Sequence, residues 1–402
     1  MQSALEGIKV IDAGLLVQGP QSAAYLRDLG AQVIKVELPG FGDQSRFLFL
    51  SDTDFRSAFY SACNRGKRSI TLDLRTESGS DILKKLIVDT DILISNFKPG
   101  TMEEWGLGYE SLSEINPKLI WAAGSTFGPL GPDSHREGAD LAAQCAGGIV
   151  STTGFDGDDP SPVGVTIADH IGSLNMTIGI LTALYHRQTT GRGQKIETSL
   201  LGGQTWAQAS EITHYLMSGE LPGRANFGHP LVRATYRIFE TSDGWIGLIA
   251  IPLDKFDEFL VAIERTDILL DERFQNHGIQ ADRGKSSGWD SWFSKELAKT
   301  IKKHTTAYWT DLFQRTGVRY APVNTYEQVS ADEGVRANGY IQGMQDGDGE
   351  TYDAVIPPLR MSETPLNPGK SVPSLGQHTG EILSELGYTE EQTEKLQTER
   401  VV

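Results

Sequence analysis

The chain has 402 residues, 39% of them hydrophobic and 22% charged, which is the composition of a soluble globular protein and a length that favours two domains. Its formal net charge of −17 argues against a protein that binds nucleic acid or anionic membranes, and a polyanionic ligand would need a local cluster of cations. No apolar run reaches the ~18 residues of a membrane span, and the N-terminus lacks the pattern of a secretory signal.

The first 200 residues alternate short apolar strands with helices. Strands are predicted at 8–14, 31–37, 68–74, 91–97 and 118–128. Helices are predicted at 19–31 and from Thr76 to about Val88. This alternation predicts a parallel sheet covered on both faces, with ligands at the loops beyond the carboxyl ends of the strands.

Asp169 stands just ahead of a long helical pattern. The apolar residues that recur at steps of three and four are Ile171, Leu174, Ile178, Leu181 and Tyr185. Because aspartate is a favoured N-cap, Asp169 is first interpreted as the cap of this helix. The helix dipole would also keep a carboxylate there ionised, and a carboxylate with one free oxygen can attack an acyl group. Spacing alone does not decide between a cap and a nucleophile.

A second pattern begins near residue 225. Residues 234–251 predict two strands joined by a Ser-Asp-Gly turn, followed by a helix at 253–263. Two amphipathic helices at 291–318 and a strand at 318–325 complete a small α+β domain at 225–330. We expect both ends of the chain to belong to the larger domain.

The common cofactor and metal motifs are missing. The first turn, DAGLLVQGPQSA, lacks the glycines that let a backbone close on a pyrophosphate, so NAD or FAD binding is disfavoured. No P-loop and no G-x-S-x-G elbow occur. The eight histidines have no metal-binding spacing, and Cys63 and Cys145 are far apart. We therefore expect no metal, two reduced buried thiols and a cytoplasmic protein.

Seven stretches, in order, resemble the class III CoA-transferases. They are LEGIKVIDAG, GPQSAAYLRDLGAQVIKVELPGFGD, NRGKRSITLDL, NFKPG followed by WGLGYESLSEINPKLI, AQCAGGIVSTTG, GILTALYHRQTTGRGQKI and PSLGQHTGEILSELGY. The similarity runs nearly end to end, is densest over 5–200 and weakens between 210 and 330. The family includes formyl-CoA transferase, carnitine CoA-transferase and α-methylacyl-CoA racemase, and this chain resembles the transferase branch.

The resemblance implies an α/β architecture with a large Rossmann-like domain and an interlocked-ring homodimer. The large domain would be built from residues 1–205 and 331–402, with a linker at 206–224 and the small domain at 225–330. Active sites would lie between domains of different subunits. Acyl-CoA and a carboxylic acid, expected to be a small dicarboxylate or hydroxy acid, would be the substrates, with no tightly bound cofactor.

The resemblance also assigns chemistry, because Asp169 falls on the catalytic aspartate of the ADHIGS motif. Asp169 would form a mixed anhydride with the donor acyl group and then an aspartyl-CoA thioester. Asp140 matches an acidic position beside this nucleophile, where it could orient Asp169 or raise its pKa. Gln18 is the third catalytic candidate, although it lies one place later than the glutamine of formyl-CoA transferase, whose slot Val17 takes.

Several residues match positions that bind CoA. They are Val17, Leu72, Arg75, Asn96, Phe97, Lys98 and Arg136. Arg75 and Lys98 would supply positive charge for phosphate, with Lys67 and Arg68 as neighbours. Two departures affect this site, since Leu38 replaces a usual basic residue and Glu104 replaces an arginine of formyl-CoA transferase.

The acceptor pocket departs from that of formyl-CoA transferase. The glycine-rich mobile loop before SDGWIGL is absent, so formyl-CoA:oxalate exchange is not expected. The stretch RANFGHPLVRATY is expected to build the pocket instead, with His229 and Arg233 holding a distal carboxylate or polar group.

Two alternatives stay open. Racemases of this family use a histidine in a Gly-His-Asp triplet, and here that triplet is Gly138-Ala139-Asp140. Ala139 cannot move a proton, but His135 and His170 lie close by in the sequence. A non-catalytic CoA-binding paralogue is the other alternative, and the intact Asp169 argues against it.

Overall fold

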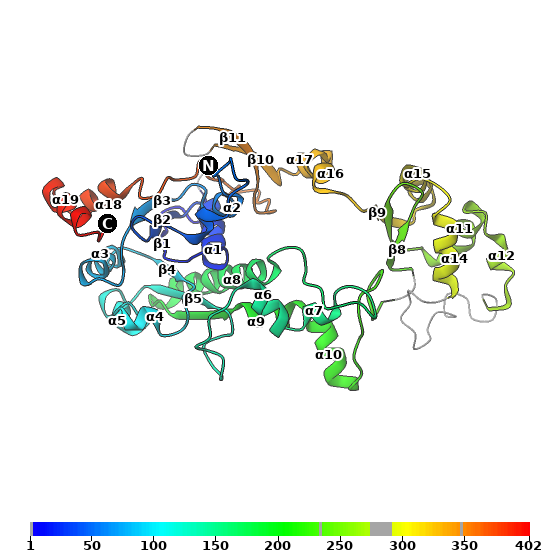
Figure 1. Cartoon of the computed structure of the whole chain (residues 1–402), viewed down its shortest axis with the longest axis horizontal. Helices are drawn as coiled ribbons and strands as arrows, with labels where there is room; N and C mark the ends of the chain where they lie inside the picture. Colours follow the sequence, from blue (N-terminus) through cyan, green and yellow to red (C-terminus); the bar gives the residue numbers. More distant parts are fainter. Residues whose placement is uncertain (1–2, 233–234, 274–291, 346–348) are drawn as a thin grey trace. The chain divides into compact units, whose positions relative to one another are not determined.

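The computed structural model describes residues 3–232, 235–273, 292–345 and 349–402 (Figure 1). The chain divides into two compact units. The first is formed by 1–147, 164–207 and 330–402, and the second by 148–163 and 208–329.

The first unit contains a six-stranded parallel sheet in the order β3-β2-β1-β4-β5-β6. Its strands are β1 (Lys9–Asp12), β2 (Gln32–Glu37), β3 (Arg68–Thr71), β4 (Ile92–Ser95), β5 (Ile120–Ser125) and β6 (Lys195–Ser199). The predicted α/β fold with a parallel sheet is confirmed. The edge strand β6 was not predicted, because its sequence KIETS carries few apolar side chains.

Helices cover both faces of this sheet (Figure 1). They are α1 (Gln18–Asp28), α2 (Ala58–Asn64), α3 (Glu77–Ile87), α4 (Thr101–Glu104), α5 (Tyr109–Ile115), α6 (Asp140–Ala146), α8 (Ile167–Thr190) and α9 (Leu200–Ala207), with a 3₁₀ turn η1 (Gln44–Phe47). On one face Ile11 and Leu93 pack with α3 and α5, and on the other Val10 and Ile92 pack with α1 and α8. Alternate residues of each buried strand thus serve opposite faces.

The C-terminal segment returns to the first unit. It contains α17 (Glu333–Ala337), β10 (Ile341–Gln345), β11 (Thr351–Val355), α18 (Thr379–Glu385) and α19 (Glu390–Thr398), and α16 (Tyr326–Ala331) lies at the junction of the two units. Arg68 on β3 bonds to Glu381 and Glu385 on α18, each at 2.7 Å. The sequence had suggested Arg68 as a neighbour of a phosphate site. In the structure its guanidinium instead pairs with the C-terminal helix α18.

The second unit is an antiparallel sheet packed against helices. Its elements are α7 (Ile149–Thr152), α10 (Ala209–Ser218), β7 (Arg237–Glu240), β8 (Trp245–Ala250), η2 (Leu253–Lys255), α11 (Phe256–Ala262), α12 (Thr266–Leu269), α14 (Trp292–Ile301), α15 (Thr306–Thr316) and β9 (Arg319–Pro322). Phe239, Phe259, Trp309 and Phe313 fill its core.

The unit boundaries differ from the predicted ones in two places. Residues 148–163 were assigned to the large domain, but Ala225 and Asn226 donate backbone hydrogen bonds to Thr152 and Gly154, at 2.8 and 2.9 Å. Residues 206–224 were predicted as a linker, and most of them form α9's end and the helix α10.

Helix α8 buries a different face from the predicted one. Its buried residues are mostly small: Ala168, Asp169, Gly172, Ser173, Met176, Thr177, Ile180, Ala183 and Leu184. The predicted apolar stripe faces outward instead, with Leu174, Ile178 and Tyr185 exposed by 42%, 61% and 73%. By length and composition α8 is the one described helix that could cross a membrane, but its small-residue face packs against α1, β5 and β6 as a core helix does.

A buried cluster of charges holds the loop between β1 and α1. Lys35 bonds to Asp43 at 2.8 Å and lies 3.7 Å from Asp12, and Asp12 also bonds to Lys67 at 2.7 Å. Asp43 accepts the backbone N–H of Leu16, a residue held at φ +61. Burial opposes the charge of Lys35, but the surrounding carboxylates outweigh it and raise the pKa of Lys35. Lys67 is thus an internal structural group and was wrongly predicted as a phosphate contact.

Replacing Lys35 should destabilise the fold strongly. Lys35→Met leaves two buried carboxylates without this cation, and we expect a loss of about 3–5 kcal/mol in the free energy of unfolding. Lys84→Met, which removes only an exposed pair with Asp81, should cost less than about 1 kcal/mol. Urea denaturation of both variants tests this, and equal losses would contradict it.

Candidate active site

Asp169 and Asp140 meet at the N-terminus of α8. The helix starts at Ile167, so Asp169 is its third residue and not its N-cap, which is Thr166. Oδ1 of Asp140 accepts the backbone N–H of Ala168 at 2.7 Å and of Asp169 at 3.3 Å. Asp140 therefore caps α8, and the interpretation of Asp169 as the cap was wrong.

The carboxylate of Asp169 is left without a hydrogen-bond partner among the described residues, although it is only 9% exposed. Burial, and the charge of Asp140 beside it, raise the pKa of Asp169 to about 7. Desolvation and a like charge thus oppose the ionisation that the helix dipole was expected to favour.

His170 is held away from this carboxylate by bonds on both ring nitrogens. Nδ1 pairs with Oε1 of Gln21 at 2.8 Å, and Nε2 pairs with Oγ1 of Thr166 at 3.3 Å. The amide oxygen accepts only, so the network assigns the proton to Nδ1. Burial lowers the pKa of His170 below its ordinary value. Because both ring nitrogens are hydrogen-bonded, neutral His170 has no free nitrogen with which to accept a proton.

Gln18 points into the protein between β5 and α8. It is 2% exposed at the first turn of α1, and its Nε2 has no hydrogen-bond partner among the described residues. Two glycines make room for it, since a Cβ on Gly124 would lie 2.3 Å from its Oε1 and one on Gly172 would lie 2.9 Å from its Nε2. Val17, the N-cap of α1, is 3% exposed and offers a ligand little surface.

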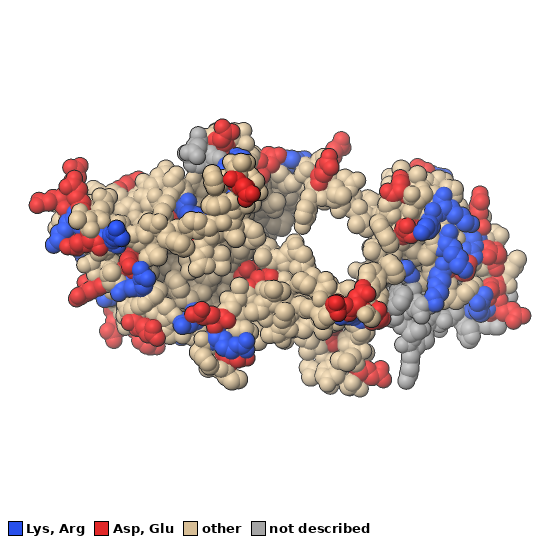
Figure 2. Space-filling view, in the orientation of Figure 1, with Lys and Arg blue, Asp and Glu red and all other residues tan. Residues whose placement is uncertain are grey.

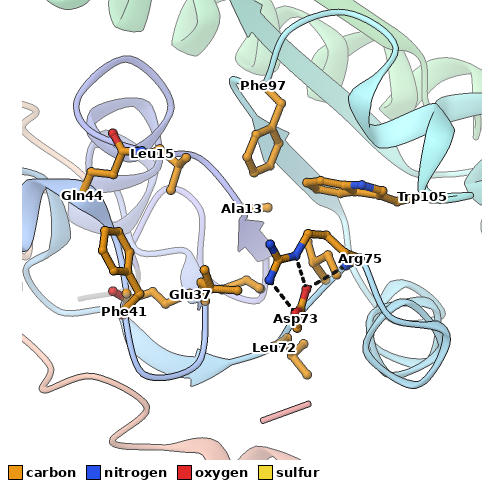
Figure 3. A pocket seen from close by; sticks show the side chains of 14 residues that line it. Ala13, Leu15, Glu37, Phe41, Gln44, Leu72, Asp73, Arg75, Phe97 and Trp105 are labelled. Carbon is orange, nitrogen blue, oxygen red and sulfur yellow. Dashed lines mark hydrogen bonds and ion pairs between the residues drawn. The ribbon is translucent and has the colours of Figure 1, made fainter. Parts of the chain in front are cut away.

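A pocket opens beyond the ends of β1, β2 and β3 (Figure 3). Three predicted CoA residues line it, namely Leu72, Arg75 and Phe97. The structure adds Phe41 and Trp105, which the sequence analysis did not select although both stand within the resembling stretches. Phe97 and Trp105 pack edge to face, with ring centroids 5.1 Å apart. The walls thus suit a flat aromatic group.

The cations predicted for phosphate are spread out and already paired. Arg75 makes two bonds of 2.7 Å to Asp73. Lys98 lines a neighbouring cavity and lies 3.4 Å from Glu137, and Arg136 bonds to Asp133 at 3.0 Å. On the face in Figure 2, basic side chains of the first unit are scattered among acidic ones, whereas those of the second unit gather over α14.

The other predicted positions have mainly structural contacts or lie elsewhere. The side-chain amide of Asn96 accepts the backbone N–H of Leu15 at 2.7 Å and donates to its backbone oxygen at 2.8 Å, so Asn96 shapes the first loop. Leu38 lines the pocket, and Glu104 is an exposed residue of α4. His229, in the second unit, pairs with Glu211 at 2.8 Å. Arg233 lies outside the described residues.

The remaining polar groups do not suggest a metal or dinucleotide site. No group of three His, Cys, Asp or Glu able to hold a metal occurs in the described part of the chain. Glu37, at the end of β2, lines the pocket, and its buried carboxylate already accepts hydrogen bonds from Arg46 at 2.8 Å and Ser69 at 2.7 Å. Cys63 is buried as predicted, but Cys145 is exposed.

Comparison with known proteins agrees with the α/β fold and its parallel sheet. The family model of CoA-transferase family III matches residues 5–379, and the chain belongs to that family. It is an enzyme of the CoA-transferase class, EC 2.8.3.-, with CoA thioesters as substrates.

The relatives and solved structures cover nearly the whole chain. The chain is 33% identical to succinate–glutarate CoA-transferase of Agrobacterium fabrum, over 95% of each protein. It is 33% identical to succinyl-CoA–D-citramalate CoA-transferase of Chloroflexus aurantiacus, over 99% of this chain and 98% of that one. A CaiB/BaiF family protein from Brucella suis superposes with a TM-score of 0.84 at 32% identity, over 96% and 100% of the two chains.

Replacing the buried carboxyl of Asp169 by a neutral side chain should increase the stability of the fold, by an amount that depends on pH. Because the folded-state pKa of Asp169 lies above its unfolded value, the stability of the folded chain falls as pH rises from about 4 through 7. Asp169→Asn should therefore be more stable at pH 8, by up to about 4 kcal/mol for a shift of three units, and the gain should vanish near pH 4.

Thermal or urea denaturation across this pH range measures the effect. Asp158→Asn, at an exposed site, is the matched control and should give a small difference at every pH. A stability difference for Asp169→Asn that does not change with pH would contradict the raised pKa.

Proposed function

We propose that this enzyme moves CoA from succinyl-CoA, or a similar acyl-CoA, to a small dicarboxylic or hydroxy acid, with Asp169 as the nucleophile. The free, buried carboxylate of Asp169 beside the capping Asp140 is the observation that carries the proposal. The substrates in the names of the relatives support the acid class: succinate, glutarate and D-citramalate for the two described above, and mesaconate for a CoA-transferase of Haloarcula hispanica.

The proposed reaction begins at the thioester carbonyl of the donor. A carboxylate oxygen of Asp169 attacks it, the C–S bond breaks, and a mixed anhydride and CoA thiolate result. The thiolate attacks the aspartyl carbonyl and releases the donor acid as its carboxylate. The acceptor carboxylate then attacks the aspartyl-CoA thioester, and the expelled thiolate takes the new acyl group and restores Asp169. Every bond broken is replaced, so no water or other reactant is consumed.

The raised pKa of Asp169 suits these steps. An anion in a buried site has lost much of its hydration and is a better nucleophile than one in water, and a pKa of about 7 still allows this anion to form near neutral pH. Asp140 keeps the helix N–H groups occupied, so the oxygens of Asp169 stay available. Burial also limits hydrolysis of the anhydride.

We propose that the aromatic pocket holds the nucleotide of CoA. Phe41, Phe97 and Trp105 would contact the adenine, and Arg75 would turn from Asp73 toward a phosphate. Lys98 and Arg136 would add charge along the cofactor, and Val17 and Asn96 would shape the loop beside it. Gln18 would contribute through its unpaired amide, and His229 and Arg233 would receive the distal carboxylate of the acid.

The racemase alternative is the weaker one. A two-base proton exchange needs a second base, and Ala139 replaces the histidine of the triplet. His170 has both nitrogens bonded, to Gln21 and Thr166. The relatives named above are CoA-transferases.

Trapping the intermediate tests the proposed chemistry. The enzyme is incubated with a panel of acyl-CoAs, and the peptide that contains Asp169 is examined by mass spectrometry for a CoA adduct. We expect succinyl-CoA to give the adduct, Asp169→Ala to abolish it with at least a 1000-fold loss of kcat, and kcat/KM to rise with pH through about 7.

Measurements of CoA transfer and of solvent deuterium exchange separate the alternative functions. Full transferase activity in Asp169→Ala would overturn the proposal. Solvent deuterium at Cα of a chiral acyl-CoA, without CoA transfer, would favour the racemase, and the absence of both activities would favour a CoA-binding paralogue.

We also propose that the enzyme is a homodimer and that the outward stripe of α8 is part of its interface. Leu174, Ile178, Leu181 and Tyr185 expose 36% to 73% of their surface along one helix. A contiguous apolar surface of this kind favours a protein partner, and an uncharged stripe can meet its own copy across a two-fold axis.

A charge within the stripe should break this assembly. We expect Ile178→Glu to be monomeric at micromolar concentration and the wild type to be dimeric, as measured by light scattering after size exclusion. Val88→Glu, at another exposed apolar residue beyond the end of α3, is the matched control and should remain dimeric. A wild-type monomer, or an unchanged mass for Ile178→Glu, would contradict the interface.

A further inference from the structure

Gln144 lies one helical turn beyond Asp140 on α6. It is 2% exposed, and its Nε2 donates to Oδ2 of Asp140 at 2.6 Å and to the backbone oxygen of Val165 at 3.2 Å. One amide group therefore joins α6 to the segment that leads into α8. Gln144 lies within the stretch AQCAGGIVSTTG.

The bond from Gln144 completes the hydrogen bonding of Asp140. Oδ2 is held by Gln144, while Oδ1 receives the N–H groups of Ala168 and Asp169. Asp140 is the first residue of α6 but makes no cap for its own helix, and Thr166 makes no side-chain cap for α8. The start of α8 thus depends on the rotamer of Asp140, and that rotamer depends on a neutral donor on its far side.

We propose that Gln144 is a positioning residue for the nucleophile, and that it fixes Asp140 so that Asp169 stands at the thioester. This inference rests on the proposed role of Asp169. Gln144 acts through Asp140 and does not touch the substrate. A donor is required at this place because a third carboxylate would repel the two already there.

Few titratable groups lie on the helices around the contact between Gln144 and Asp140. On α6 they are Asp140 itself and the exposed Cys145, and on the first turn of α8 they are Asp169 and His170. Helix α9, which packs against both, carries none between Leu200 and Ala207. A change in pH dependence on altering Gln144 therefore reports on the two aspartates.

The substitution Gln144→Met keeps the volume and removes the donor. We expect kcat to fall at least 10-fold, KM for acyl-CoA to stay within 2-fold, and the acid limb of kcat/KM to shift, because the carboxylate beside Asp169 loses the donor that holds its Oδ2. Thr177→Val is the matched control, since it removes a buried hydrogen bond between Thr177 of α8 and Ser22 of α1. Its acid limb should match that of the wild type.

A second variant keeps the inference testable if Gln144→Met folds poorly. Gln144→Glu can donate to Asp140 only when protonated, so its activity relative to the wild type should increase as pH falls from 8 to 6. A relative activity that stays level or decreases would overturn the inference.

Failure of this inference can be told from failure of the proposed function. If the wild type forms the CoA adduct on Asp169 while Gln144→Met forms it at the same rate with the same acid limb, only the role of Gln144 is overturned. If the wild type forms no adduct, the proposed function fails first.

Discussion

The capping of α8 by Asp140 is the constraint on which the site depends. A helix that begins inside a protein must satisfy its first N–H groups, and a polar side chain at its own N-cap ordinarily serves this purpose. Here the carboxylate of another helix does so, at 2.7 and 3.3 Å from Ala168 and Asp169. The carboxylate of Asp169 is therefore not needed to cap the helix. Asp140, which caps it instead, also contributes to the raised pKa of Asp169, so one neighbour affects both the position and the protonation of this carboxylate.

Several other buried charges of the first unit, unlike that of Asp169, are paired with charges of opposite sign. The buried lysines Lys35 and Lys67 are matched by Asp12 and Asp43, and this neutral cluster sets the loop that leads into α1. Among the described residues that line the aromatic pocket, Arg75 is the one Lys or Arg, and it bonds to Asp73. In the proposed role of this pocket, ring packing would supply most of the contact with a CoA nucleotide, and Arg75 would have to leave Asp73 before it could bind a phosphate.

The sequence predicted the large features because they rest on periodicity and on ordered motifs. Alternating strands and helices gave the parallel sheet, and the resembling stretches gave the family. What could not be predicted were contacts between residues far apart in the chain. Asp169 looked like a cap because local spacing favours that reading, whereas the capping carboxylate comes from 29 residues earlier. Gln144 and Trp105 carried no local signal of a role, and the pairing of Lys67 with Asp12 spans 55 residues.

The orientation of α8 shows why periodicity alone misleads at such a site. Its apolar stripe of Leu174, Ile178 and Tyr185 has the spacing of a core face, yet the helix turns its small residues to the sheet. Gly172 and Ser173 allow α1 and Gln18 to approach closely, and larger residues there would push the first turn of α8 away from Asp140. The small residues of α8 therefore pack against the sheet, while its large apolar side chains face outward. Because one helix carries both faces, a partner bound to the outer face, as proposed above, would contact the same element that positions Asp169.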